Sequence, residues 1–211
     1  AKIGAVQTTI FSGYSADALK IRLQDSNAKV LFVSDGFVRK GKNISQKEQI
    51  LDAVKETNIE KIIVTEHSNI DRYDYSDFCF EYSQIVAGQP DSFQAKSMDS
   101  EDPLFILYTS GTTGKPKGVI HTHGGYAVYA GHQASYLIDL TPDDILFWPA
   151  DIGWITGQVW NLYGLLEVGA SAVIYDGAID HPSVERIFEL LTEYNVTIFG
   201  ISPTATRMLR K

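Results

Sequence analysis

The stretch Ile106–Gly125, ILYTSGTTGKPKGVIHTHGG, places a polar loop between two apolar segments. The ten residues Thr109–Gly118 include three glycines, two lysines, three threonines and one serine. The flanking segments 104–109 and 118–122 predict β-strands. Glycines permit positive φ, and successive backbone N–H groups in such a turn can form an anion-binding nest. The pattern favours a phosphate-binding turn between two strands over the alternative, a solvated hairpin turn.

The loop does not match the other common phosphate-binding motifs. A Walker A loop has four residues between its glycines, then Lys and Ser or Thr, and it opens a helix. Here Gly111 and Gly114 are separated by two residues, Pro116 follows Lys115, and a strand-like segment comes next. The sequence contains no G-x-G-x-x-G. A helix beginning at Lys115 would contradict this interpretation.

Helix and strand patterns alternate after the loop, which favours an α/β fold. We expect helices over 125–138, 153–169 and 181–195, and strands over 145–150, 171–175 and 196–202. The last segment, TATRMLRK, resembles the start of another helix. In the helix over 153–169 we expect Gly169 as the C-terminal cap and an inward stripe of Ile155, Val159, Leu162, Tyr163 and Leu166. In the helix over 181–195 we expect Pro182 at the start and an inward stripe of Val184, Ile187, Phe188 and Leu191.

The same alternation precedes the loop. We expect strands over 29–35 and 61–67. The helix over 14–26 would have Ser15 as its N-cap and Ala18, Leu19, Arg22 and Leu23 facing inward. The helix over 45–58 would have Ile50, Leu51 and Val54 facing inward. Periodicity fades over 68–102, which we interpret as a surface connection that includes some structure. The fold prediction is α/β, with mixed, largely parallel sheets and packed helices, in parts 1–67, 68–102 and 103–211.

Composition limits the possible functions. The 211 residues carry a formal net charge of −8, which argues against a broad nucleic-acid-binding face. The single cysteine, Cys79, cannot form an internal disulfide and suits the cytoplasm. No apolar run reaches the length of a membrane span, and no secretory signal peptide is evident. Because the sequence lacks an initiator Met and ends in a helix-like segment, we expect a piece of a longer protein.

The segment YTSGTTGKPKGV resembles the phosphate-binding signature of the adenylate-forming superfamily, which includes acyl-CoA synthetases, luciferases and peptide-synthetase adenylation domains. Three further segments, GAVQTTIFSGYSADALKIRLQDS, EDPLFILYTSGTTGKPKGVIHTHGGY and PADIGWITG, resemble the AMP-forming acetyl-CoA synthetase branch. The resemblance covers essentially the whole chain. It implies part of the family's large N-terminal domain, without the mobile C-terminal domain.

The resemblance implies a ligase with two half-reactions. A short carboxylic acid attacks the α-phosphorus of ATP to give an acyl-adenylate, and the CoA thiol then takes the acyl group. Together with Mg²⁺, whose ligands lie mostly downstream, the loop would hold the triphosphate and offset charge repulsion. Thr112 and Lys115 would act most directly, and Lys117 could instead brace the loop. The implied ATP-binding residues are Thr109, Ser110, Gly111, Thr112, Thr113, Gly114, Lys115 and Lys117.

Two further patches complete the implied site. In DIGWITG, Trp154, Ile155 and Thr156 would line the acyl pocket and the path of the CoA thiol; the alternative is a buried helix start with an aromatic plug. Gln158 stands where many relatives have His. In VRKGKN, Arg39 and Lys42 would meet the nucleotide end of CoA, with Lys in place of a second Arg; the alternative is a solvated basic turn. Asp180 stands where the family has a CoA-contacting Asn.

Other candidates are weaker. His121 and His123 lack a third ligand at metal spacing, so no metal site is predicted. Asp151 is interpreted as a helix N-cap, and Asp143 and Asp144 as a turn. We expect the chain alone to be inactive, since the family's adenine, ribose and magnesium segments are missing. A non-catalytic binding module and a ligase for another carboxylic acid stay open as alternatives, and acyl length and oligomeric state cannot be derived.

Overall fold

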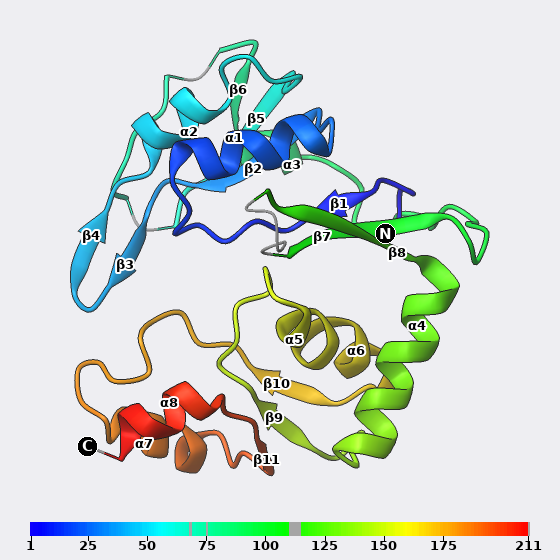
Figure 1. Ribbon diagram of the computed structural model, residues 1–211, viewed down its shortest axis with the longest axis vertical. Helices are drawn as coiled ribbons and strands as arrows, with labels where there is room; N and C mark the ends of the chain where they lie inside the picture. Colours follow the sequence, from blue (N-terminus) through cyan, green and yellow to red (C-terminus); the bar gives the residue numbers. More distant parts are fainter. Residues whose placement is uncertain (68, 75, 110–114, 211) are drawn as a thin grey trace. The chain divides into compact units, whose positions relative to one another are not determined.

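A computed structural model describes residues 1–67, 69–74, 76–109 and 115–210 (Figure 1). The chain forms two compact units. The first consists of residues 1–97 and 108–119, and the second of residues 98–107 and 120–211. Two three-stranded sheets are parallel and a two-stranded sheet is antiparallel, which confirms the predicted α/β class. The three-part division at residues 67 and 102 stays a prediction.

The first unit is built on a parallel sheet with strand order β2-β5-β6. Val30 pairs with Lys61, and Ile62 with Cys79. Helices α1 and α2 lie beside this sheet, and their apolar faces pack with its buried strand residues in one core (Figure 1). The elements are α1 (Ala16–Asp25), β2 (Val30–Ser34), α2 (Lys47–Ala53), β5 (Lys61–Thr65), β6 (Cys79–Glu81) and α3 (Tyr82–Val86).

The first predicted helix is confirmed in detail. The Ser15 side chain caps α1 by accepting a hydrogen bond from the Ala18 N–H at 3.3 Å. Leu19, Arg22 and Leu23 are all buried, as the stripe predicted. The segment 68–102 contributes β6 and α3, which adds a third strand to the sheet where we had expected mainly a connection.

The second predicted helix is shorter than expected, and one inward residue is wrong. The Asp71 carboxylate accepts hydrogen bonds from the Ser45 hydroxyl (2.8 Å) and the N–H groups of Gln46 (3.1 Å) and Lys47 (3.2 Å). A residue distant in sequence thus caps the first turn of α2. Ile50 and Ala53 are buried at helical spacing, which leaves Leu51 on the exposed side.

Two further sheets carry predicted site residues. Strands β3 (Phe37–Arg39) and β4 (Lys42–Ile44) form an antiparallel hairpin. Its turn residues, Lys40 and Gly41, have φ of 49° and 72°, as a two-residue type I′ turn requires. Another sheet has the order β1-β7-β8 and is composed of β1 (Gln7–Thr8), β7 (Pro103–Thr109) and β8 (Lys117–Thr122). Residue 115 precedes a strand rather than opening a helix, which confirms the rejection of a Walker A loop.

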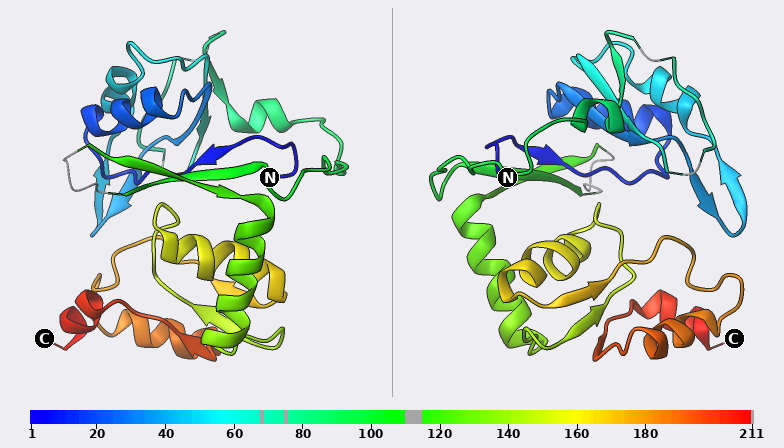
Figure 2. Two further views of the ribbon diagram at one scale, coloured as in Figure 1. Left: turned by 45° about the vertical axis from the view of Figure 1, so that its right-hand side comes forward. Right: turned by 180° about the vertical axis from the view of Figure 1, so that it is seen from behind.

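The second unit is built on a parallel sheet with strand order β10-β9-β11. Helix α4 packs along α6, and α7 covers β9 and β11 through Ile187 and Leu190 (Figure 2). The final helix, α8, confirms the helical pattern at the end of the sequence. The elements are α4 (His123–His132), η1 (Gln133–Leu137), β9 (Ile145–Phe147), α5 (Ile155–Gly157), η2 (Gln158–Tyr163), α6 (Gly164–Val168), β10 (Ser171–Val173), α7 (Arg186–Glu193), β11 (Ile198–Phe199) and α8 (Pro203–Leu209).

The long helix predicted over 153–169 exists as the consecutive segments α5, η2 and α6, but its inward stripe is partly wrong. The middle segment is a π-helix, whose hydrogen bonds join residues i and i+5. Each such hydrogen bond spans one residue more than in an α-helix, which shifts the buried face of the segment that follows. Leu165 is therefore buried and Leu166 is 68% exposed. Val159 is buried as predicted, and Gly169 ends the helix in the left-handed conformation with φ of 81°.

The prediction for the 181–195 helix is also corrected. Helix α7 begins at Arg186, so Pro182 is not at its start. From that start the buried positions are Ile187 and Leu190, three residues apart, and Phe188 is 52% exposed. The buried face of α7 runs through Ile187 and Leu190, with Leu191 half-buried beside them, and Phe188 lies outside it.

Candidate active-site residues

The glycine-rich loop is flanked by one hydroxyl and two cations. Thr109 ends β7, Lys115 precedes β8 and Lys117 begins it, and all three are exposed. The predicted phosphate-binding residues Ser110, Gly111, Thr112, Thr113 and Gly114 lie outside the residues that the structure describes. The described flanks place exposed positive charge beside the loop, which suits an anion.

The strand that enters the loop is fixed by a polar network that the sequence analysis missed. The Tyr108 hydroxyl donates a hydrogen bond of 2.7 Å to the Asp25 carboxylate on α1. The Arg22 guanidinium lies 4.1 Å from the Tyr14 ring centroid and 5.7 Å from that of Tyr108. Burial and the bond to Asp25 raise the pKa of Tyr108. The residue before Thr109 is thereby anchored to the first helix of the same unit.

The hairpin presents the two predicted CoA-binding cations side by side. Arg39 and Lys42 are directly opposite each other across β3 and β4, and both are exposed. Like charges at opposing positions of a strand pair destabilise the hairpin slightly, and a bound anion would relieve that repulsion. Asp180, the third residue assigned to CoA, is half-buried and belongs to the second unit.

The predicted acyl-pocket residues lie at the start of the helical stretch in the second unit. Trp154 is the N-cap residue of α5 and is 53% exposed, so the alternative of a buried aromatic plug does not describe it. Ile155 is 37% exposed, and Thr156 is half-buried. The Gln158 N–H donates to the Trp154 carbonyl at 3.1 Å and closes the first turn.

Two minor predictions about aspartates have different outcomes. Asp151 is not a helix N-cap; its carboxylate accepts a hydrogen bond from the Gly153 N–H at 2.6 Å and shapes the preceding loop. The turn at Asp144 is confirmed, since its carboxylate accepts bonds from the Thr141 hydroxyl (2.7 Å) and N–H (2.8 Å). These bonds lower the pKa of Asp144, with the Thr141 hydroxyl the largest cause.

His121 belongs to an aromatic cluster in the second unit. Its ring stacks on Phe105 with centroids 4.6 Å apart, and Tyr126 meets it edge-on at 5.0 Å. Burial lowers the pKa of His121, because the low-polarity surroundings disfavour the charged ring. His121 is therefore half-buried and packs against the core residues Phe105 and Tyr126.

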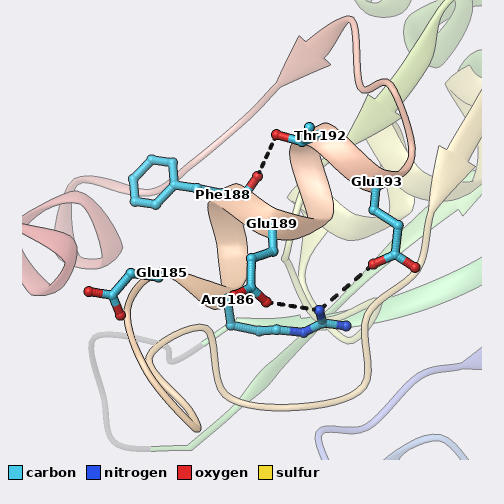
Figure 3. Close-up of a pocket in the computed structure, with 6 residues that line it drawn as sticks. All are labelled: Glu185, Arg186, Phe188, Glu189, Thr192 and Glu193. Carbon is cyan, nitrogen blue, oxygen red and sulfur yellow. Dashed lines mark hydrogen bonds and ion pairs between the residues drawn. The ribbon is translucent and has the colours of Figure 1, made fainter.

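A shallow hollow lies on the outer face of α7 (Figure 3). Arg186 pairs there with Glu189 at 3.2 Å and with Glu193 at 3.7 Å, and the Thr192 hydroxyl bonds to the Phe188 carbonyl. The hollow contains none of the predicted site residues. The Arg186 ion pairs run along a single helix, as on many solvated helix surfaces.

In the part of the chain that the structure describes, neither a metal site nor a membrane-spanning helix is found. No group of three or more His, Cys, Asp and Glu side chains there could hold a metal ion. None of the helices there combines the length and apolar character that a bilayer crossing requires.

Comparison with known proteins identifies the family. The sequence model of the AMP-binding enzymes matches residues 1–211. Acetyl-coenzyme A synthetases from Methanothrix thermoacetophila and Escherichia coli are both 41% identical, over 100% and 99% of this chain and 32% of each relative. An acetoacetyl-CoA synthetase from Streptomyces lividans aligns with a TM-score of 0.88 at 26% identity, covering 100% of this chain and 32% of that one. The chain thus spans about a third of the length of these relatives. It belongs to the AMP-binding enzyme family.

Proposed function

We propose that the chain is part of an AMP-forming ligase that activates acetate or another short carboxylic acid with ATP and transfers the acyl group to CoA. The observation that carries this proposal is the 41% identity to acetyl-coenzyme A synthetases over the whole chain. The exposed lysines at the strand–loop–strand agree with it, because they supply charge where a triphosphate would bind. The site would be completed by parts of the full-length protein outside these 211 residues.

The adenylation step must bring a carboxylate to a polyanionic triphosphate. In the proposal, Lys115 and the loop residues Ser110–Gly114 hold the β- and γ-phosphates, with Thr109 and Lys117 at the two strand ends. Preorganised donors at such a site stabilise the charge that develops as pyrophosphate leaves. The anchoring of Tyr108 to Asp25 keeps the strand end in place, so the donors need not reorganise during reaction. The electrons of the new bond come from the carboxylate oxygen, and the leaving pyrophosphate takes the electrons of the broken bond.

The acid and CoA would use the remaining predicted residues. Ile155 would contact the short acyl chain, with Trp154 and Thr156 along the path of the thiol. Arg39 and Lys42 would meet phosphates of CoA, and Asp180 would meet one of its hydroxyl or amine groups. Mg²⁺ would neutralise part of the triphosphate charge; we assign no ligand for it to this chain. A cytoplasmic location is also part of the proposal, because one buried thiol, that of Cys79, suits a reducing compartment.

The test is acid-dependent ATP–pyrophosphate exchange by the full-length protein that carries this chain. Acetate, propionate, butyrate and acetoacetate would be compared, followed by thioester formation with CoA. Exchange with acetate and thioester formation would support the proposal. Exchange with only another acid would establish the alternative ligase. No exchange with any acid, despite ATP binding, would establish the non-catalytic binding module and overturn the proposal. The isolated chain is expected to show no exchange.

A further inference from the structure

Two buried amide side chains hold the loop that leads into the predicted acyl pocket. The Asn161 amide nitrogen donates to the carbonyl oxygens of Trp148 (2.8 Å) and Ala150 (3.2 Å). The Gln158 amide nitrogen donates to the carbonyl oxygen of Ile152. The residues Gln158 and Asn161 are 1% and 8% exposed. Three alternate carbonyls of one loop are thus fixed by donors on the π-helical segment η2.

The backbone lies unusually close to the helix at the same place. A methyl group added at Gly157 would overlap the carbonyl oxygen of Asp151, so only glycine fits there without movement. The Trp154 N–H also donates to the Asp151 carbonyl at 3.1 Å. The loop therefore rests directly on the first turn of the helix, and the two amides bind it on either side of that contact.

The start of the loop is held by aromatic packing. The Trp148 ring stacks on Trp160 with centroids 5.3 Å apart and planes 14° from parallel. A methyl group at Gly200 would overlap the Trp148 ring, so this glycine leaves the space that the ring occupies. The loop is thus clamped at Trp148 by stacking and along its length by amide donors, up to the exposed residues Trp154 and Ile155.

Packing alone does not explain the choice of amides at these positions. Burying an amide costs free energy unless its hydrogen-bonding groups find partners. The Asn161 side-chain oxygen accepts no hydrogen bond from the residues that the structure describes. An apolar side chain of similar volume would avoid that cost. The amide nitrogens bind the carbonyl oxygens of the loop and so hold its path against η2.

From this geometry we propose that Gln158 and Asn161 are positioning residues for the carboxylic acid substrate. By fixing the loop over 148–153 they set the place of Trp154 and Ile155, and through these the fit of the acyl group. This inference rests on the proposed function, because it assigns the acyl pocket to Trp154–Thr156. It also gives Gln158 a role: its amide points to the loop backbone and not to the substrate.

The experiment uses the full-length protein and three variants. Gln158→Met and Asn161→Leu remove the donors and keep similar volume. Each is expected to raise the KM for the acid about 10-fold in pyrophosphate exchange, because a misplacement of about 1 Å can cost up to about 10²-fold. The KM for ATP should stay within about 2-fold of the wild-type value. A lower amount of folded enzyme would reduce the rate without changing any KM. Gln158→His keeps an N–H donor, so its KM for the acid is expected to stay near the wild-type value, unlike that of Gln158→Met.

A matched control separates positioning from stability. Leu165 is buried on α6 of the same helical stretch, and its side chain makes no hydrogen bond. Leu165→Ala is expected to lower Tm and leave the KM for the acid unchanged. The positioning role is overturned if the donor-free variants keep the wild-type KM, if Leu165→Ala raises it equally, or if Gln158→His is as impaired as Gln158→Met. A wild-type protein without acid-dependent exchange would instead overturn the proposed function itself.

Discussion

Polar side chains in two regions of this protein are used in opposite ways. Beside the glycine-rich loop, Thr109, Lys115 and Lys117 are exposed. In the helical stretch of the second unit, Gln158 and Asn161 are buried and bind the backbone of their own chain. Exposed donors can meet a ligand directly, whereas buried donors can act on it only through the segments they fix.

This difference predicts two kinds of mutational effect. Removing an exposed cation costs little stability, because a surface charge makes few contacts that folding depends on. Its loss should appear in rate or substrate affinity. Removing a buried polar group leaves its partner without a hydrogen bond and costs stability as well.

The glycine-rich loop should show the largest effect. In the full-length protein, Lys115→Ala or Thr112→Ala should lower pyrophosphate exchange by about 10²–10³-fold, the usual cost of losing one preorganised contact to developing charge. Tm should not change for the Lys115 variant, since its side chain is exposed. Lys96→Ala removes another exposed lysine of the same unit and serves as the control. Unchanged exchange in both loop variants would contradict the phosphate role.

The hairpin should show an intermediate effect, confined to the second half-reaction. Replacing Arg39 and Lys42 together with Ala should raise the KM for CoA about 10-fold and leave pyrophosphate exchange nearly intact. Charge-assisted bonds are worth about 1.5–3 kcal/mol each when well formed, and exposure to water and salt reduces this. The measurement is thioester formation against CoA concentration, with acid and ATP saturating. A curve that does not move would show that the hairpin is only a solvated turn.

The half-buried His121 should show the smallest effect, and this effect should be on stability rather than on rate. Its pKa is lowered by burial from 6.5, so the unfolded chain binds a proton below that pH more readily than the folded one. Stability should therefore fall as pH drops below about 6.5, and His121→Phe should reduce this fall. The comparison is Tm at about pH 7.5 and about pH 5.5 for both proteins. An equal drop in wild type and variant would exclude His121 as a source of acid sensitivity.

Local sequence signals were enough for the elements around the loop. The apolar runs on both sides of Thr109–Gly118 predicted β7 and β8, and the proline and glycine spacing excluded a helix after the loop. Ser15 could be predicted as the N-cap of α1, because an N-cap hydrogen bond spans only three residues. Gly169 predicted a helix end for the same reason, since its left-handed conformation is a local property.

Sequence periodicity by its spacing of apolar residues did not identify every residue that faces the core. In α2 the apolar spacing predicts an inward Leu51, whereas packing in the core selects Ile50 and Ala53. Leu166 was placed inward because a period of 3.6 residues cannot anticipate the π-helical turn before it. In α7 the apolar spacing predicts an inward Phe188, whereas packing on the sheet selects Ile187 and Leu190.

The α/β class, the strand–loop–strand and the charge beside it could be predicted from the sequence, because they depend on residues that are close along the chain. Which polar side chains are buried, and what they hold, depends on how distant segments pack. Tyr108 reaches Asp25 across 83 positions of the chain. In sequence, Gln158 only differs from the His of many relatives. In the structure its amide donates to the Ile152 carbonyl, and that orientation depends on the fold around it.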